Sequence, residues 1–242
     1  MFTVWHVLAV ATITDLATGL GALPFLVVRR VSAQWQGAMY ALSGGLMLGA
    51  SAGLAVEGFR LNLFGIIVGA LLGIAFIEFG RRLIPENIMF AALTGEAAQK
   101  ALVIVGVMTI HSAAEGVAVG VAFGGGARLA ALIPLAIAVH NIPEGLAISA
   151  VLHSKGKGLL SCIWWSVFSS IPQPLLAVPA YLFVEWFRPG LPYGLGFAGG
   201  AMVYMVVREL WPDAVKALPR PAVLAIMGGG LVAMYLFQHW LG

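Results

Sequence analysis

The chain has 242 residues, of which 61% are hydrophobic and only 10% are charged. A soluble domain carries about 25% charged residues, so this composition excludes a soluble globular protein. The net charge of +3 comes without basic patches, which argues against nucleic-acid binding. The single cysteine, Cys162, excludes a disulfide or a cysteine-rich metal cluster within one chain.

Long apolar runs between the charges predict an all-α polytopic membrane protein, because a bilayer core of about 30 Å takes about 20 residues of helix. The runs are continuously apolar rather than alternating, which disfavours a transmembrane β-barrel. In the longest connection, 81–99, Pro85 leaves room for a short interfacial segment. We expect one transmembrane domain, 1–242, with eight spans at 3–28, 36–56, 62–80, 100–124, 128–152, 159–185, 191–209 and 222–241.

Lysine and arginine are distributed unevenly between the two sides of this topology. Positive residues favour cytoplasmic loops, so we expect a multi-pass protein of the cell (inner) membrane with both termini extracytoplasmic. The side opposite the termini carries ten of the thirteen, namely Arg29, Arg30, Arg81, Arg82, Lys100, Lys155, Lys157, Arg208, Lys216 and Arg220. The side of the termini carries Arg60, Arg128 and Arg188.

The fourth and fifth predicted spans share the pattern His-x-x-x-Glu-Gly. It occurs at His111 and Glu115 and again at His140 and Glu144. Positions i and i+4 share one face of a helix, so each span directs an imidazole and a carboxylate to one place. Both pairs fall about midway along their spans, where an ionised carboxylate costs roughly 2.5–3.5 kcal/mol. Lysine and arginine are absent from the neighbouring turns, which favours a divalent cation as partner.

For either His/Glu pair taken alone, hydrogen bonding between helices is the alternative to metal binding. Pro143 lies inside the fifth motif and frees the carbonyl of Val139. Ser112 and Asn141, each following a motif histidine, serve either as oxygen ligands or as ordinary packing contacts. Neither the His-Glu-x-x-His signature of metalloproteases nor clustered histidine boxes occur. The pattern therefore favours binding and passage of a metal over hydrolysis or oxygen chemistry.

The two motifs resemble the fourth and fifth spans of the ZIP family of divalent metal transporters, of bacterial type. Further similarity lies in Ala17-Thr-Gly-Leu-Gly-Ala-Leu-Pro24, Gly44-Gly-Leu-Met-Leu48 and Gly196-Phe-Ala-Gly-Gly-Ala-Met202, which resemble the first, second and seventh spans. The resemblance implies inverted repeats of spans one to three and six to eight around spans four and five. It also implies that one helical group slides against the other, within a possible homodimer.

Carried over residue by residue, the resemblance makes His111, Glu115, His140 and Glu144 the primary metal ligands. It implies a thioether ligand at Met47, and positions serving a second metal at Ser112 and Asn141. Two positions depart from the family pattern. Gln173 stands where the family carries a glutamate, which puts the second metal in doubt, and Arg208 precedes Glu209 where related bacterial sequences tend to have two acids.

These features predict a transporter, not an enzyme, that moves a divalent transition metal toward the cytoplasm through a mid-membrane site. Imidazole, carboxylate and thioether ligands suit Zn(II) best, with Fe(II), Cd(II) and Mn(II) as other candidates and no resident cofactor. The alternatives are a membrane-embedded metalloenzyme with Glu115 or Glu144 as general base, and a metal-selective channel. Asp15 in the first span and Glu57 at the end of the second are candidates for the entrance of the ion path. For Asp15, the alternative is an interhelical hydrogen bond.

Overall fold

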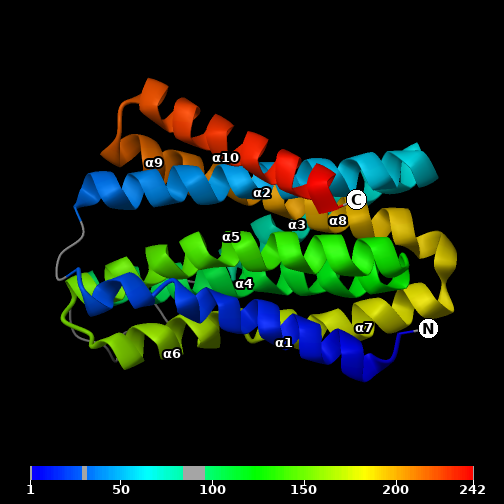
Figure 1. Cartoon of the computed structure of the whole chain (residues 1–242), viewed down its shortest axis with the longest axis horizontal. Coiled ribbons are helices and arrows are strands. Elements are labelled where there is room, and N and C mark those ends of the chain that lie inside the picture. Colours follow the sequence, from blue (N-terminus) through cyan, green and yellow to red (C-terminus); the bar gives the residue numbers. More distant parts are fainter. Residues whose placement is uncertain (1, 29–31, 84–95, 242) are drawn as a thin grey trace.

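The chain folds into an elongated bundle of helices that run along its long axis (Figure 1). The computed structural model describes residues 2–28, 32–83 and 96–241, with the backbone alone for 96–104. Across these ranges the regular elements are helices, and no strand occurs among them. The α-helices are α1 (Val4–Leu20), α2 (Ala33–Leu61), α3 (Leu63–Arg82), α4 (Glu96–Gly124), α5 (Ala127–Ser154), α6 (Leu159–Ser170), α7 (Pro172–Trp186), α8 (Leu191–Met205), α9 (Trp211–Ala217) and α10 (Arg220–Leu241).

Eight helical stretches within the described residues are long and apolar enough to cross a membrane. The α6–α7 and α8–α9 pairs each make one stretch, and a 3₁₀ turn (Leu23–Leu26) extends α1. This confirms the prediction of an all-α polytopic membrane protein. The stretches are Val4–Leu26, Ala33–Leu61, Leu63–Arg82, Val105–Gly124, Ala127–Ser154, Leu159–Trp186, Arg188–Ala217 and Arg220–Leu241. The segment expected around Pro85 lies outside the described residues.

The surface of the bundle is apolar, as a lipid-facing surface requires. Trp5, Phe64, Leu71 and Leu175 are 77%, 68%, 61% and 64% exposed, respectively. In water such a surface would promote aggregation, whereas hydrocarbon tails solvate it at no cost. The buried set includes two histidines, two glutamates and several serines and threonines. These polar groups therefore face the interior, where several of them form hydrogen bonds between helices.

The helices pack as two groups. The first, which we call the site bundle, comprises α1, α4, α5, α6 and α7, with α4 against α7 and α1 against α5. The second, the flanking bundle, comprises α2, α3, α8, α9 and α10, with α3 against α8 and α10 against α2. The groups meet where α2 packs on α5 and α4 on α8. Figure 1 shows α4 and α5 in the middle of the molecule, with both termini at the same end.

The sixth predicted span, 159–185, is two helices rather than one. The chain bends at Ile171, between the end of α6 and the start of α7. Pro172 and Pro174 lack the N–H groups that would continue the helical ladder, and a proline ring also clashes with the carbonyl four residues before it. At the bend, the Ile171 N–H donates to the carbonyl of Phe168, three residues earlier, at 3.4 Å.

The second and seventh spans extend past their predicted ends at 56 and 209. The charges of Glu57 and of Arg208 and Glu209 were expected to end these helices, but interhelical ion pairs hold both glutamates within continuous helical stretches. Glu57 of α2 pairs with Arg128 of α5 at 3.0 Å. Glu209 pairs with Arg81 of α3 at 2.6 Å, and it lies in a π-helical turn (Val206–Leu210) that connects α8 to α9.

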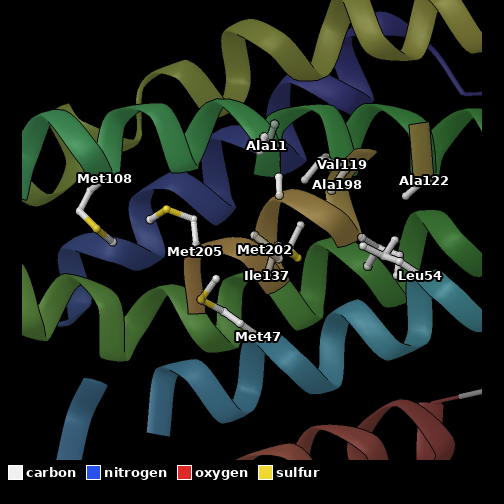
Figure 2. Close-up of a cluster of buried hydrophobic side chains, with 14 of the residues drawn as sticks. Ala11, Met47, Leu54, Met108, Val119, Ala122, Ile137, Ala198, Met202 and Met205 are labelled. Carbon is white, nitrogen blue, oxygen red and sulfur yellow. The ribbon is translucent and has the colours of Figure 1, made fainter. Parts of the chain in front are cut away.

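A cluster of buried apolar side chains fills the space where the two bundles meet. Figure 2 shows Met47 of α2 beside Ile137 of α5 and beside Met202 and Met205 of α8. All four are at most 1% exposed. Methionine is flexible and unbranched, so this contact can repack without opening voids.

Candidate metal centre

The two repeated motifs meet at the centre of the site bundle. His111 and Glu115 lie on α4, and His140 and Glu144 lie on α5. All four side chains are at most 2% exposed. Each of the four offers one donor atom, and these donors all lie within 4.8 Å of one another. The i, i+4 spacing has therefore brought together two imidazoles and two carboxylates, as the sequence predicted.

The shortest contact in this cluster crosses between the two helices. Nε2 of His140 lies 2.5 Å from Oε1 of Glu115, and Nε2 of His111 lies 3.1 Å from the same oxygen. Nε2 of His111 is also 3.8 Å from Oε2 of Glu144. The Nε2 atoms of both imidazoles thus point to a common space that the two carboxylates share.

Many polar atoms around this space lack hydrogen-bond partners. Within the described part of the chain, neither nitrogen of His111 makes a hydrogen bond, although its Nε2 lies 3.1 Å from Oε1 of Glu115. Nδ1 of His140, Oε2 of Glu115 and both carboxylate oxygens of Glu144 also lack a hydrogen-bond partner there. A buried polar atom without a partner costs about 1–3 kcal/mol, and more when it is charged. Six such atoms in one cluster fit a site for a cation better than a completed hydrogen-bond network.

A glycine follows each motif glutamate and lets a neighbouring helix approach the site. A methyl group on Gly116 would collide with the backbone carbonyl of Gln173 in α7, and one on Gly145 with that of Thr18 in α1. The contact atoms are backbone oxygens, so side-chain rotation cannot relieve the collision. The glycines of the two motifs therefore place α7 and α1 directly beside the candidate metal ligands.

Two predicted residues, Asn141 and Gln173, lie against each other beside the cluster. The Asn141 amide donates to the backbone carbonyl of Thr14, 3.0 Å, and to Oε1 of Gln173, 3.3 Å. Both side chains are fully buried. Among the described residues, Oδ1 of Asn141 and Nε2 of Gln173 have no hydrogen-bond partner. Gln173 therefore lies next to the candidate site, in contact with the residue that follows His140.

Ser112 belongs to a chain of hydroxyl groups across three helices. Ser170 and Thr18, the other two members of this chain, were not predicted from the sequence. The Ser112 hydroxyl donates to Ser170 of α6 at 3.5 Å, and Ser170 donates to Thr18 of α1 at 3.1 Å. A signal was present in the sequence, because Thr14, Asp15 and Thr18 share one face of an otherwise apolar helix. That face of α1, together with Ser170 of α6, forms the polar wall behind the cluster.

Asp15 is buried in the same wall at 4% exposure. Its Oδ1 has no hydrogen-bond partner among the described residues. The four-residue donor group does not include it. Oδ1 of Asp15 therefore does not make the interhelical hydrogen bond that was one of the two predicted roles of this residue.

Met47 comes from the flanking bundle and lies in the apolar cluster of Figure 2. It faces α5 through Ile137, which precedes His140 by three residues and shares a face with it. The four histidine and glutamate ligands all belong to the other bundle. A Met47 ligand would therefore link the two bundles at the site.

Two charged groups examined for the ion path are paired with other charges. Glu57 accepts from Arg60 at 3.4 Å and from Arg128 at 3.0 Å, so its carboxylate is compensated by two guanidinium groups. Glu209 pairs with Arg81, while Arg208 beside it is exposed. The outer carboxylate thus lies in a positively charged surrounding, which is unfavourable for a cation entrance.

The chain resembles named zinc transporters along most of its length. It is 31% identical to "zinc transporter GufA" of Myxococcus xanthus over 95% of this chain and 96% of that protein. It is 32% identical to "zinc transporter ZIPB" of Bordetella bronchiseptica over 91% of this chain and 76% of that one. A candidate zinc transporter of Arabidopsis thaliana is 42% identical over 83% of this chain, which spans 33% of that protein. No family model matches the chain.

Eight apolar helices around a buried group of two histidines and two glutamates define a multi-pass membrane protein with a candidate metal centre. The near full-length similarity to the Myxococcus and Bordetella proteins then settles the family. The chain belongs to the ZIP family of metal transporters.

Proposed function

We propose that this protein carries zinc across a membrane by binding it at His111, Glu115, His140 and Glu144. The observation that supports this most is the buried cluster of converging donors, six of whose polar atoms lack a partner among the described residues. Relatives named zinc transporters supply the identity of the ion. Zinc is a substrate here, not a resident cofactor.

Charge balance favours a single divalent ion in this donor group. Two carboxylates supply two negative charges, and two neutral imidazoles add none. Mixed nitrogen and oxygen donors at four positions suit Zn(II), whereas Mg(II) and Ca(II) prefer oxygen ligands alone. Fe(II), Cd(II) and Mn(II), which the donor types also admit, stay predictions. Met47 is proposed as an additional thioether ligand from the flanking bundle.

Ser112, Asn141 and Gln173 are proposed to line a weaker position for a second ion. They offer neutral oxygen atoms in a buried space next to the four primary ligands. The one acidic side chain in the polar wall described here is Asp15, which lies outside the donor group. We therefore propose one tightly held zinc ion per chain.

Burial of the ligands favours alternating access over a permanent channel. All four are at most 2% exposed, so an ion reaches or leaves them only when helices move. The division into a site bundle that holds the ligands and a flanking bundle suggests the moving parts. Their shared surface contains flexible methionines, which tolerate sliding. We propose that the site bundle moves against the flanking bundle.

We propose inward transport in the cell membrane, with both termini extracytoplasmic. The positive charges support this orientation. Toward the end opposite the termini, the described residues include Arg81 and Arg82 of α3, Lys155 and Lys157 after α5, Arg208 in the π-helical turn, Lys216 of α9 and Arg220 of α10. Arg60, Arg128 and Arg188 lie at the end of the termini. Arginine and lysine prefer the cytoplasmic side. The homodimer implied by family resemblance stays a prediction.

Reconstitution in liposomes tests transport against the two alternatives. With a zinc-sensitive dye inside, the protein should produce influx that saturates with external zinc, and Glu144→Gln should abolish it. Flux that rises linearly over the same range would favour a channel, and zinc-dependent turnover of an organic substrate without flux would favour a metalloenzyme. The relatives' names favour transport over an enzymatic role.

A further inference from the structure

A pocket of about 380 Å³ opens between α2, α5 and α10, at the end of the molecule where both termini lie. It is separate from the metal centre and contains none of its ligands. One side carries the charged groups of Glu57, Arg60 and Arg128. Most of the remaining lining is apolar and includes Val56, Leu129, Leu132 and Ile133, while α10 adds Tyr235, Gln238 and His239. The pocket is thus amphiphilic.

The charged side of the pocket has an excess of positive charge. Arg60 and Arg128 share a single carboxylate oxygen of Glu57, at 3.4 and 3.0 Å. Each guanidinium carries five N–H donors, and most of these are left for another acceptor. The side chains of Arg60 and Arg128 are 64% and 54% exposed. Two guanidiniums against one carboxylate leave one net positive charge facing the pocket.

A third donor lies deeper in the same pocket. Gln238 of α10 is 8% exposed and lines the pocket, and its Nε2 has no hydrogen-bond partner within the described residues. Its amide rests against Gly53 of α2, where a methyl group would meet Oε1 at 2.6 Å. Gly53 precedes Glu57 by one helical turn, about 5.4 Å along the axis. The unpaired amide therefore lies below the two guanidiniums.

We infer that this pocket binds the phosphate headgroup of an anionic phospholipid. The guanidiniums of Arg60 and Arg128 would contact the phosphate oxygens, and the Gln238 amide would donate to an oxygen of the glycerol ester region. The acyl chain would follow the apolar wall formed by Val56, Leu132 and Ile133. Basic pockets between transmembrane helices recognise lipid headgroups by this combination of charge and apolar surface.

The apolar walls favour a lipid over a free anion. A free phosphate ion would use the guanidiniums but leave the apolar side against water. A metal cation is disfavoured because the net charge of the cluster is positive. The pocket also joins α2 and α10 of the flanking bundle to α5 of the site bundle. A bound lipid would therefore contact both bundles.

Native mass spectrometry of the delipidated full-length protein tests the inference independently of zinc transport. Phosphatidylglycerol, phosphatidylcholine and inorganic phosphate are titrated separately. We expect phosphatidylglycerol to bind at least about tenfold more tightly than the other two. The net positive charge of the pocket repels the choline cation of phosphatidylcholine, and inorganic phosphate has no acyl chain to cover the apolar wall. The paired change Arg60→Gln with Arg128→Gln should remove that preference, and Gln238→Leu should weaken it.

Arg220→Gln is the matched control, because Arg220 is an exposed arginine at the opposite end of α10. It should leave phosphatidylglycerol binding unchanged. Because the side chains of Arg60 and Arg128 are exposed, the paired variant should fold, and its thermal unfolding midpoint without lipid should match that of the parent. Equal binding of phosphatidylcholine or of inorganic phosphate, unchanged binding in the paired variant, or an equal loss in Arg220→Gln would overturn the assignment.

Discussion

At the residue scale, we expect the proposed metal centre to depend on the charge of Glu144 as well as on its position. Neither of its carboxylate oxygens has a hydrogen-bond partner among the described residues, and its Oε2 lies 3.8 Å from Nε2 of His111. Glutamine keeps the shape of the side chain but removes its charge. We expect Glu144→Gln to weaken zinc binding at least about tenfold, roughly 1.4 kcal/mol, as measured by calorimetry in detergent.

Glu185→Gln provides the control for this change. Glu185 lies near the end of α7 and pairs with Arg188 at 2.8 Å. It does not belong to the buried group of four donors. The variant should bind zinc as the parent does. Equal zinc affinity in Glu144→Gln and in the parent would contradict the proposed ligand.

The position of Gln173 makes a second prediction, about stoichiometry. It contacts Asn141 beside the primary ligands but brings no charge. Glutamate can accept the same hydrogen bond and adds the negative charge that a second ion needs. We therefore expect one zinc ion per chain in the parent and a value approaching two in Gln173→Glu, by elemental analysis. Two tightly held ions in the parent, or no change in the variant, would refute this charge argument.

Zinc binding should weaken in acid, because protons compete with the metal for imidazole nitrogen. Metal-bound histidine must be neutral, and histidine side chains ordinarily gain a proton near pH 6.5. We expect zinc affinity to be highest above about pH 7.5 and to fall through about pH 5.5. An affinity that is constant over this interval would argue against His111 and His140 as ligands.

The primary donors could be predicted from sequence because i, i+4 spacing fixes their direction on a helix. The polar wall behind them could not. Thr14, Thr18 and Ser170 lie on helices distant in sequence, and single serines and threonines in an apolar helix look alike whether they face lipid or protein. Tertiary packing decides which of them reaches the site.

At the scale of elements, the motif glycines control how closely helices pack around the metal centre. Gly145→Ala would place a methyl group against the Thr18 carbonyl of α1. Overpacking of this kind costs about 1–3 kcal/mol. We expect a lower thermal unfolding midpoint for Gly145→Ala in detergent, together with loss of zinc binding as α1 moves away.

Gly228→Ala is the matched change, since a methyl group there meets nothing within 4 Å. It should leave the unfolding midpoint equal or slightly higher, because alanine favours helix over glycine. If both variants unfold at the same temperature, the close contact between α1 and α5 is not important for stability.

The ends of elements were less predictable than their existence. Apolar runs predicted the eight membrane-crossing stretches found among the described residues, whereas charged residues misled the predicted ends of the second and seventh. Glu57 and Glu209 lie inside continuous helical stretches because Arg128 and Arg81 approach them from other helices. The bend at Ile171 was missed for a different reason. The prolines that cause it were visible, but proline also occurs within the continuous α5 at Pro134 and Pro143.

At the scale of the whole molecule, the grouping into two bundles depends on contacts between distant segments. Helix α2 ends at Leu61 and α10 begins at Arg220, yet the two helices pack together, as do α3 and α8. No local pattern specifies such pairs. Family resemblance supplied the central position of α4 and α5, which Figure 1 shows. The inverted repeats implied by that resemblance stay a prediction.

The central claim is that zinc binds between α4 and α5, at the four converging donors. Anomalous X-ray diffraction at the zinc edge from zinc-soaked crystals tests it most directly. We predict one strong peak about 2.0–2.2 Å from imidazole nitrogen and carboxylate oxygen of His111, Glu115, His140 and Glu144, and its loss in Glu144→Gln. A principal peak elsewhere in the protein, or one that persists unchanged in that variant, would contradict the account.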